Sequence, residues 1–119
     1  MESYKVVRPE HLNHFGYLFG GFTLMWVDEI SWIAASRDYP GCSFVTVSMD
    51  KVEFRRGVHQ GAVLRFDVRE RHAGKTSVEY EVQVYADDLE TGTEEAIFQT
   101  HIRFVCLDAM GKKTLLPRR

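Results

Sequence analysis

The sequence predicts a two-layer α+β domain, in which one long helix lies against one antiparallel sheet. Three observations predict this fold class. A single strongly apolar helical segment occurs early in the chain, segments of alternating apolar and polar residues follow it, and short turns separate those segments. Strands joined by short turns pair antiparallel, and one helix on one sheet makes two layers. The 119 residues suit a single domain that covers residues 1–119.

The helix is predicted over residues 20–37, where Gly20-Gly21 opens it and Pro40-Gly41 follows it. Its apolar residues cover nearly the whole circumference: Phe22, Leu24, Met25, Trp26, Val27, Ile30, Trp32, Ile33, Ala34 and Ala35. A helix that is apolar nearly all round is buried on most sides. We therefore expect the sheet to curl round it.

About five strands are predicted, four of them long. They lie at residues 3–7, 44–55, 62–71, 76–86 and 95–107, and residues 8–19 form a loop. The last three strands alternate cleanly between the two faces of the sheet. Their inward side chains are expected to be Leu64, Phe66, Val68, Val78, Tyr80, Val82, Val84, Ala96, Phe98, Thr100, Ile102, Phe104 and Cys106.

The first long strand has a change of phase. Val45, Val47 and Met49 share one face, and the apolar parity then reverses at Val52. A bulge inserts one extra residue and turns the following side chains to the other face. The pattern predicts such a bulge near residues 50–51.

Composition excludes several classes of protein. The net charge is −2, with 15 basic and 17 acidic residues, whereas a nucleic-acid binder normally shows a basic excess. The first residues lack the apolar core of a signal peptide, and the apolar region 22–35 is too short and too charged to span a bilayer. We expect a cytoplasmic protein without a membrane or nucleic-acid partner. Cys42 and Cys106 are expected to form neither a disulfide framework nor a zinc site, and Cys106 to lie in the core.

Asp28 is the most informative polar residue. It lies in mid-helix, with Leu24, Met25, Ser31 and Trp32 three and four positions away. A carboxylate in such surroundings is costly unless it is paired or hydrogen-bonded, and functional sites are where such residues are tolerated. The alternative is that Asp28 lies on a solvent-exposed stripe of the helix together with Glu29 and Ser31.

Gly20-Gly21 and Asn13 precede this carboxylate. Glycines at a helix start let a ligand approach the backbone, and the unpaired first-turn amides can bind an anion or an oxyanion. A lone Gly-Gly pair is more often a plain helix entry, and a loop Asn is usually a turn former. His11 and His14 have no third metal ligand nearby, so no metal site is expected.

These features together resemble the signature of the hot-dog-fold acyl-CoA thioesterases, in the branch of the YciA-type and brain-type acyl-CoA hydrolases. That signature has an Asn, a Gly three residues on, a Phe-Gly-Gly-like turn, and an Asp seven residues past the second Gly. Here those residues are Asn13, Gly16, Phe19-Gly20-Gly21 and Asp28. Further similarity lies at residues 45–47, 54–55, 74–77 and 115–117, so the resemblance covers nearly the whole chain.

The resemblance implies a hot-dog fold, a long helix wrapped by a sheet of about five strands. It implies hydrolysis of acyl-CoA to free acid and coenzyme A without a metal or organic cofactor. It also implies a homo-oligomer: a dimer with interface active sites, or a tetramer or hexamer built from dimers.

The resemblance further implies the roles of the site residues. Asp28 is the general base or the nucleophile, the Gly21 amide polarises the thioester carbonyl, and Asn13 holds the water or the carbonyl. Substrate binding is assigned to Phe19, Gly20, Arg55, Arg56, Lys75, Thr76 and Ser77, although Arg55, Arg56 and Lys75 suit a solvated turn equally well. The family often has Pro where Gly57 stands and Asp where Ala62 stands, which puts the local loop and its coenzyme A contacts in doubt.

Two alternatives remain on the same fold. A non-hydrolytic acyl-CoA-binding module would keep the binding site but lack turnover, and retention of Asn13 and Asp28 argues against it. A hot-dog dehydratase would act on hydroxyacyl thioesters with a His paired to an acid. No His stands before the helix at the spacing which that chemistry requires.

Overall fold

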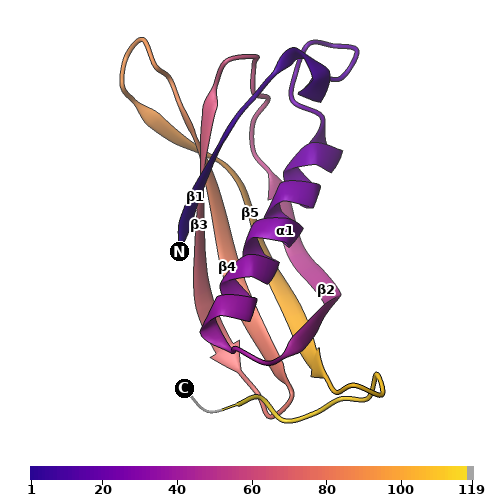
Figure 1. Cartoon of the computed structure of the whole chain (residues 1–119). Coiled ribbons are helices and arrows are strands. Elements are labelled where there is room, and N and C mark those ends of the chain that lie inside the picture. The colour runs from indigo at the N-terminus through magenta and orange to yellow at the C-terminus, as the bar shows by residue number, and fades with distance from the viewer. Residues whose placement is uncertain (118–119) are drawn as a thin grey trace.

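The structure, a computed structural model, describes residues 1–117 and places one helix against one five-stranded sheet (Figure 1). The elements are β1 Glu2–Val6, a 3-10 turn Pro9–His11, α1 Gly20–Asp38, β2 Ser43–Phe54, β3 Val63–Ala73, β4 Ser77–Asp87 and β5 Glu94–Leu107. All neighbouring strands pair antiparallel, in the order β1-β3-β4-β5-β2. The predicted fold class is confirmed. Residues 118–119, the end of the predicted domain, lie outside the described part.

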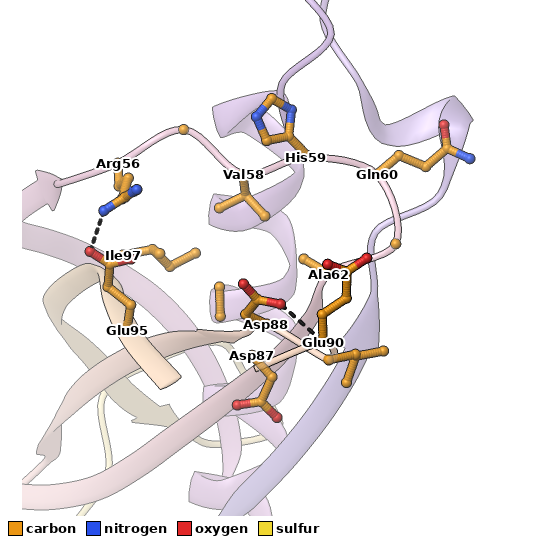
Figure 2. A pocket seen from close by; sticks show the side chains of 14 residues that line it. Arg56, Val58, His59, Gln60, Ala62, Asp87, Asp88, Glu90, Glu95 and Ile97 are labelled. Carbon is orange, nitrogen blue, oxygen red and sulfur yellow. Dashed lines mark hydrogen bonds and ion pairs between the residues drawn. The ribbon is translucent and has the colours of Figure 1, made fainter. Parts of the chain in front are cut away.

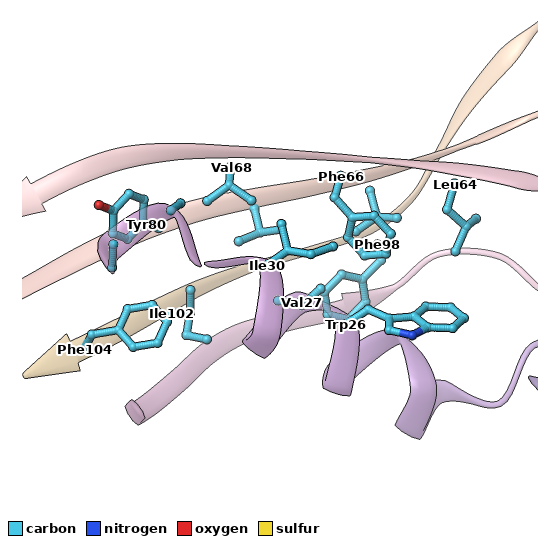
Figure 3. Close-up of a cluster of buried hydrophobic side chains, with 14 of the residues drawn as sticks. Trp26, Val27, Ile30, Leu64, Phe66, Val68, Tyr80, Phe98, Ile102 and Phe104 are labelled. Atoms are coloured by element: carbon cyan, nitrogen blue, oxygen red, sulfur yellow. The ribbon is translucent and has the colours of Figure 1, made fainter. Parts of the chain in front are cut away.

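The three central strands alternate as predicted, because their apolar residues face α1 and their polar residues face outward. The expected inward side chains are buried with the exception of Ala96, which is half-buried. Figure 3 shows Val27 and Ile30 of α1 among Phe66, Phe98 and other side chains of the sheet. This packing fixes α1 on the sheet and therefore fixes every side chain that α1 presents.

The helix is buried on one side only, so the predicted enclosure by the sheet is wrong for a single chain. Trp26, Val27 and Ile30 face the sheet, whereas Met25 and Trp32 are 52% and 45% exposed. A sheet of five strands in one chain covers one face of the helix and leaves the other apolar face open (Figure 1).

Strand β2 contains the predicted bulge and a second one. Its register shifts between Asp50 and Glu53, where Lys51 has a positive φ of 53°, which confirms the prediction. A further shift between Thr46 and Ser48 was not expected. Because this extra residue reverses the parity, Val45 is exposed while Met49 packs against the core, so their predicted common face is wrong.

Two hydrogen bonds tie the end of α1 to the sheet. The Tyr80 hydroxyl donates to Asp38 Oδ2 at 2.7 Å, and the Tyr39 hydroxyl donates to Glu70 Oε1 at 2.6 Å. Burial and the bond to Asp38 raise the pKa of the Tyr80 phenol. The phenol therefore stays protonated and the anchor stays intact at neutral pH.

The two cysteines form a disulfide, which contradicts the expectation that they stay unpaired. Cys42 precedes β2 and Cys106 lies in β5, and their Cα atoms are 5.3 Å apart despite a sequence separation of 64 residues. Pairing of β2 with β5 brings them together, and spacing along the chain gives no sign of it. Cys106 is buried, as expected.

Reduction of the Cys42–Cys106 disulfide should lower the free energy of unfolding. The bond closes a loop of 64 residues, and its loss restores chain entropy to the unfolded state, which corresponds to about 4 kcal/mol. Urea unfolding with and without dithiothreitol measures the change. The Cys42→Ser/Cys106→Ser double variant is the control, and equal stability of the oxidised and reduced wild type would contradict the prediction.

Candidate active site

The first turn of α1 is open at its N-terminus. Phe19 precedes it in an extended conformation, without a side-chain cap, and the first turn holds no acidic residue. The four leading amides of a helix have no partner within the helix, and they carry a partial positive charge. This end of α1 can therefore bind an anion or a developing oxyanion.

Both glycines at this turn lie close to aromatic side chains. A Cβ on Gly20 would lie 3.1 Å from Phe54 Cε1, and one on Gly21 would lie 2.5 Å from Phe19 Cε2. Neither glycine has a positive φ. A side chain at either position would therefore push an exposed phenylalanine ring aside, whereas the backbone conformation itself does not demand glycine.

Asn13 organises the loop before the helix. Its Oδ1 accepts hydrogen bonds from the amides of Phe15 at 2.9 Å and Tyr17 at 3.1 Å. Asn13 is thus a turn former, one of the two readings of its sequence position. Because both bonds use Oδ1, its Nδ2 group can still donate to a ligand.

Asn13 and the helix N-terminus share one cavity. It has a volume of about 260 Å³ and is lined by Asn13, Gly20, Thr23, Phe54 and Arg56 among others. The structure therefore brings three of the predicted site residues together: Asn13 of the loop, Gly20 of α1, and Arg56 in the segment that follows β2.

Asp28 lies further along α1, beside β2. The Thr46 hydroxyl donates to Asp28 Oδ1 at 2.6 Å, and within residues 1–117 Asp28 forms no ion pair. Glu29 is exposed whereas Ser31 is fully buried. The solvent-exposed stripe that was the alternative for Asp28 therefore does not extend to Ser31. The carboxylate is half-buried, hydrogen-bonded and uncompensated by a cation, which suits a base or a nucleophile.

Thr46 is the site residue that the sequence analysis missed. A Thr in a strand of Val, Ser and Met carries no signal of its own, since β-branched residues are common in strands. Only the packing of β2 against α1 shows that it contacts Asp28. With Met25, Glu29, Trp32 and Phe44, these two residues line a cavity of about 320 Å³.

The two cavities are separate within one chain. Asp28 stands seven positions after Gly21 along the helix, a rise of about 10 Å. The leading amides also point away from the body of the helix, so an oxyanion that they bind lies further still from Asp28. One carbonyl cannot be held by the Gly21 amide and attacked from Asp28 of the same chain.

Arg56 is already paired with an acidic partner. Its Nη1 donates to Glu95 Oε1 at 2.5 Å. Figure 2 shows the adjoining cavity, which has a volume of about 540 Å³ and is lined by Arg56 and His59 together with Asp87, Asp88, Glu90 and Glu95. Carboxylates outnumber cations here, which disfavours a phosphate, although a guanidinium has five N–H donors and the bond to Glu95 uses a donor of Nη1 alone.

The other predicted substrate-binding residues are not gathered in one place. Arg55 donates to Gln99 at 2.9 Å and lines a polar cavity on the sheet face opposite α1. Lys75, Thr76 and Ser77 lie at the opposite end of the sheet from Arg55 and Arg56. Ser77 pairs with Val105 and Phe54 with Phe98, seven residues apart on β5, or about 23 Å.

Other features of the chain play no part in this site. The ring of His11 packs against Phe22 and Trp26, and its Nδ1 accepts the amide of Arg8 at 2.9 Å. Within residues 1–117, no group of three or more His, Cys, Asp or Glu side chains is placed to hold a metal ion. The one α-helix in that part of the chain lacks the length and apolarity needed to cross a lipid bilayer.

Known proteins resemble this chain in sequence. An uncharacterized acyl-CoA thioester hydrolase of Bacillus subtilis, YkhA, is 33% identical over 112 residues, which cover 94% of this chain and 64% of that protein. Acyl-coenzyme A thioesterase 11 of mouse is 31% identical over 111 residues, which cover 93% of this chain and 18% of that protein. The chain thus spans less than two thirds of these relatives.

Solved structures share the fold. An acyl-CoA hydrolase of Staphylococcus aureus, in complex with butyryl coenzyme A, coenzyme A and coenzyme A disulfide, superimposes with a TM-score of 0.90 at 31% identity. The match covers 98% of this chain and 71% of that one. The predicted hot-dog fold is confirmed by these neighbours. A sequence model described as the Thioesterase superfamily matches residues 15–93, and the chain therefore belongs to that superfamily.

Proposed function

We propose that this chain hydrolyses acyl-CoA to a free acid and coenzyme A, in active sites that each use two subunits. The observation that carries the proposal is the division of the site. A helix N-terminus suited to an oxyanion and a carboxylate suited to a base lie in separate cavities of one chain. A second subunit that brings the two together makes a complete hydrolytic site.

Strand β2 is the surface through which two subunits pair. It is an edge strand, and its outer face and the uncovered side of α1 are apolar: Val45 is 41% exposed, Val47 52%, Met25 52% and Trp32 45%. An edge strand with free backbone groups pairs readily with another strand. Two copies of β2 related by a two-fold axis run antiparallel and join the two sheets into one.

This arrangement reverses one subunit relative to the other. The two α1 helices then run antiparallel, so that Asp28 of one chain approaches the Gly20-Gly21 end of the partner subunit. In the same way, Lys75 comes to the end of the assembly at which Arg56 of the partner subunit lies. The site residues that are scattered in one chain are therefore gathered by the symmetry.

The reaction follows from these positions. The Gly21 amide of one subunit polarises the thioester carbonyl, and Asn13 holds the carbonyl or the water through Nδ2. Asp28 of the other subunit takes a proton from water, which attacks the carbonyl carbon; attack by the carboxylate itself is the second route. The C–S bond then breaks, and the leaving sulfur takes the proton from Asp28, so that coenzyme A leaves as the thiol and Asp28 is again a carboxylate; on the second route, water hydrolyses the acyl-Asp28 anhydride. Thr46 positions Asp28 through its hydrogen bond.

Relatives support the choice of residues. The Staphylococcus aureus enzyme has also been solved with an Asn, an Asp or a Thr replaced by Ala. The Asn and the Asp are fifteen positions apart in that chain, as Asn13 and Asp28 are here. The Thr follows the Asp by seventeen positions, and Thr46 follows Asp28 by eighteen. A hexameric acyl-CoA thioesterase, 31% identical with a TM-score of 0.92, supports an assembly larger than a dimer.

Release of free thiol from acyl-CoA tests the proposal. We expect the protein to release coenzyme A over many turnovers from acyl-CoA substrates, butyryl-CoA among them. A thiol-reactive dye measures the released coenzyme A. The non-hydrolytic alternative expects saturable binding of acyl-CoA without turnover. The dehydratase alternative expects loss of water from a hydroxyacyl-CoA without any free thiol.

Hydrolysis needs no cofactor in this scheme. We place the protein in the cytoplasm, in fatty-acyl metabolism.

Assembly is a separate expectation. Because β2 and α1 expose apolar side chains in one chain, we expect no stable monomer at micromolar concentration by light scattering. Val47→Asp places a charge on the exposed side of β2, which should produce a monomer or a strongly weakened dimer. Val6→Asp, on the other edge strand, is the control and should retain the wild-type mass. A monomeric wild type in low salt would contradict the arrangement.

A further inference from the structure

The cavity beside Asp28 is apolar on the side away from the carboxylate. Met25, Trp32 and Phe44 form that side, whereas the polar side is formed by Asp28, Glu29 and Thr46. The helix α1 carries three large aromatic side chains, Phe22, Trp26 and Trp32. The structure separates them, since Trp26 is buried in the core and Phe22 packs against it, while Trp32 lines the cavity.

The Trp32 ring is held in place. Its Nε1–H donates to the backbone carbonyl of Phe44 at 3.1 Å, and Phe44 is itself 6% exposed in the core. The ring is 45% exposed in one chain and yet bonded to the sheet. A side chain with its polar end bonded to a strand backbone forms a fixed wall rather than an adjustable one.

Position along the helix sets the distance of this wall from the reacting centre. Trp32 is one turn beyond Asp28, which places it on the same side of the helix at a rise of about 6 Å. The acyl carbon chain begins at the carbonyl that Asp28 and its water attack. An apolar chain that enters this cavity therefore meets the indole ring after a few carbons.

We propose that the acyl group binds in this cavity and that Trp32 closes it, so that the enzyme selects short acyl groups. The proposal rests on the proposed function, because it assigns the acyl end of the same substrate. The cavity has a volume of about 320 Å³ within one chain, and in the proposed dimer the partner subunit covers its open side. Removal of the indole opens the cavity along α1, and each further methylene that becomes buried favours binding roughly fourfold.

The test compares kcat/KM for octanoyl-CoA with kcat/KM for butyryl-CoA. We expect a ratio below one in the wild type and a ratio at least tenfold higher in Trp32→Ala. Trp32→Phe, with a smaller ring that lacks the bond to Phe44, should fall between them. Tyr4→Ala removes a comparably exposed aromatic side chain, 55% exposed on β1, and should keep the wild-type ratio.

The outcomes separate this inference from the proposed function. A folded Trp32→Ala oligomer whose ratio stays within twofold of the wild type overturns the inference even if hydrolysis is fast. If the wild type releases no thiol, the proposed function fails. The comparison of octanoyl with butyryl then uses the ratio of the association constants of the two acyl-CoA thioether analogues, measured by calorimetry. A tenfold shift in that ratio upholds the inference, and an unchanged ratio or no binding overturns it.

Discussion

The Asp28→Asn variant should release thiol from acyl-CoA more slowly by roughly two to four powers of ten. The substitution keeps the size of the side chain and the acceptor for Thr46, since the amide Oδ1 can take the same 2.6 Å hydrogen bond. It removes the basic carboxylate. The measurement is kcat with the best acyl-CoA substrate, together with the dissociation constant of coenzyme A, which should change little.

Glu29→Gln is the matched control for this experiment. It removes the same charge from the same turn of α1 and from the lining of the same cavity, at an exposed position, but it leaves the hydrogen bond between Thr46 and Asp28 intact. The kcat of Glu29→Gln with the same substrate should fall less than threefold, because the charge it removes is exposed to solvent. Asp28 forms no ion pair within residues 1–117, so the Asn variant should fold normally. A well-folded Asp28→Asn oligomer with near wild-type turnover would end the proposed mechanism.

Mixing two inactive variants should restore activity. Asn13→Asp keeps the Oδ1 acceptor that the loop amides use but removes the Nδ2 donors, which should cost roughly a hundredfold or more if Nδ2 stabilises the oxyanion. In a dimer of Asn13→Asp with Asp28→Asn, one site carries both substitutions and the other carries neither. Random 1:1 assembly therefore gives about a quarter of wild-type activity.

The experiment requires co-expression with two affinity tags, so that the mixed dimers are isolated and verified by mass spectrometry. The gain over either parent should be more than tenfold. Dimers of the double variant Asn13→Asp/Asp28→Asn with wild type are the control, because each of their sites then lacks one residue, and they should be nearly inactive. If the mixed dimers of the two single variants remain as slow as their parents, Asn13 and Asp28 act from the same chain or not at all.

Local sequence determined the elements of the fold. The alternation of β3, β4 and β5 predicted which side chains are buried, because one face of each strand packs against α1 and the other faces solvent. The helix, the turns and the bulge near Lys51 follow from the same short-range patterns. The 3-10 turn at Pro9–His11 was missed, since three residues carry too little pattern to distinguish a turn from a loop.

The sequence also determined the family and the residues to examine. Asn13, Gly20-Gly21 and Asp28 stand out because a carboxylate inside an apolar helix and glycines at a helix start are costly unless they serve packing or function. Their roles in catalysis remain predictions. Spacing along the chain could show that they occur in the right order, but not which of them meet.

Tertiary structure alone decided which groups are neighbours. The bond from Thr46 to Asp28, the wall that Trp32 forms, and the disulfide between Cys42 and Cys106 all depend on how β2 lies against α1 and β5. These contacts join residues 12 to 64 positions apart, and no local preference encodes them. The separation of the helix N-terminus from Asp28 has the same origin, because a rigid helix holds the two ends of the site apart until a second chain supplies the missing half.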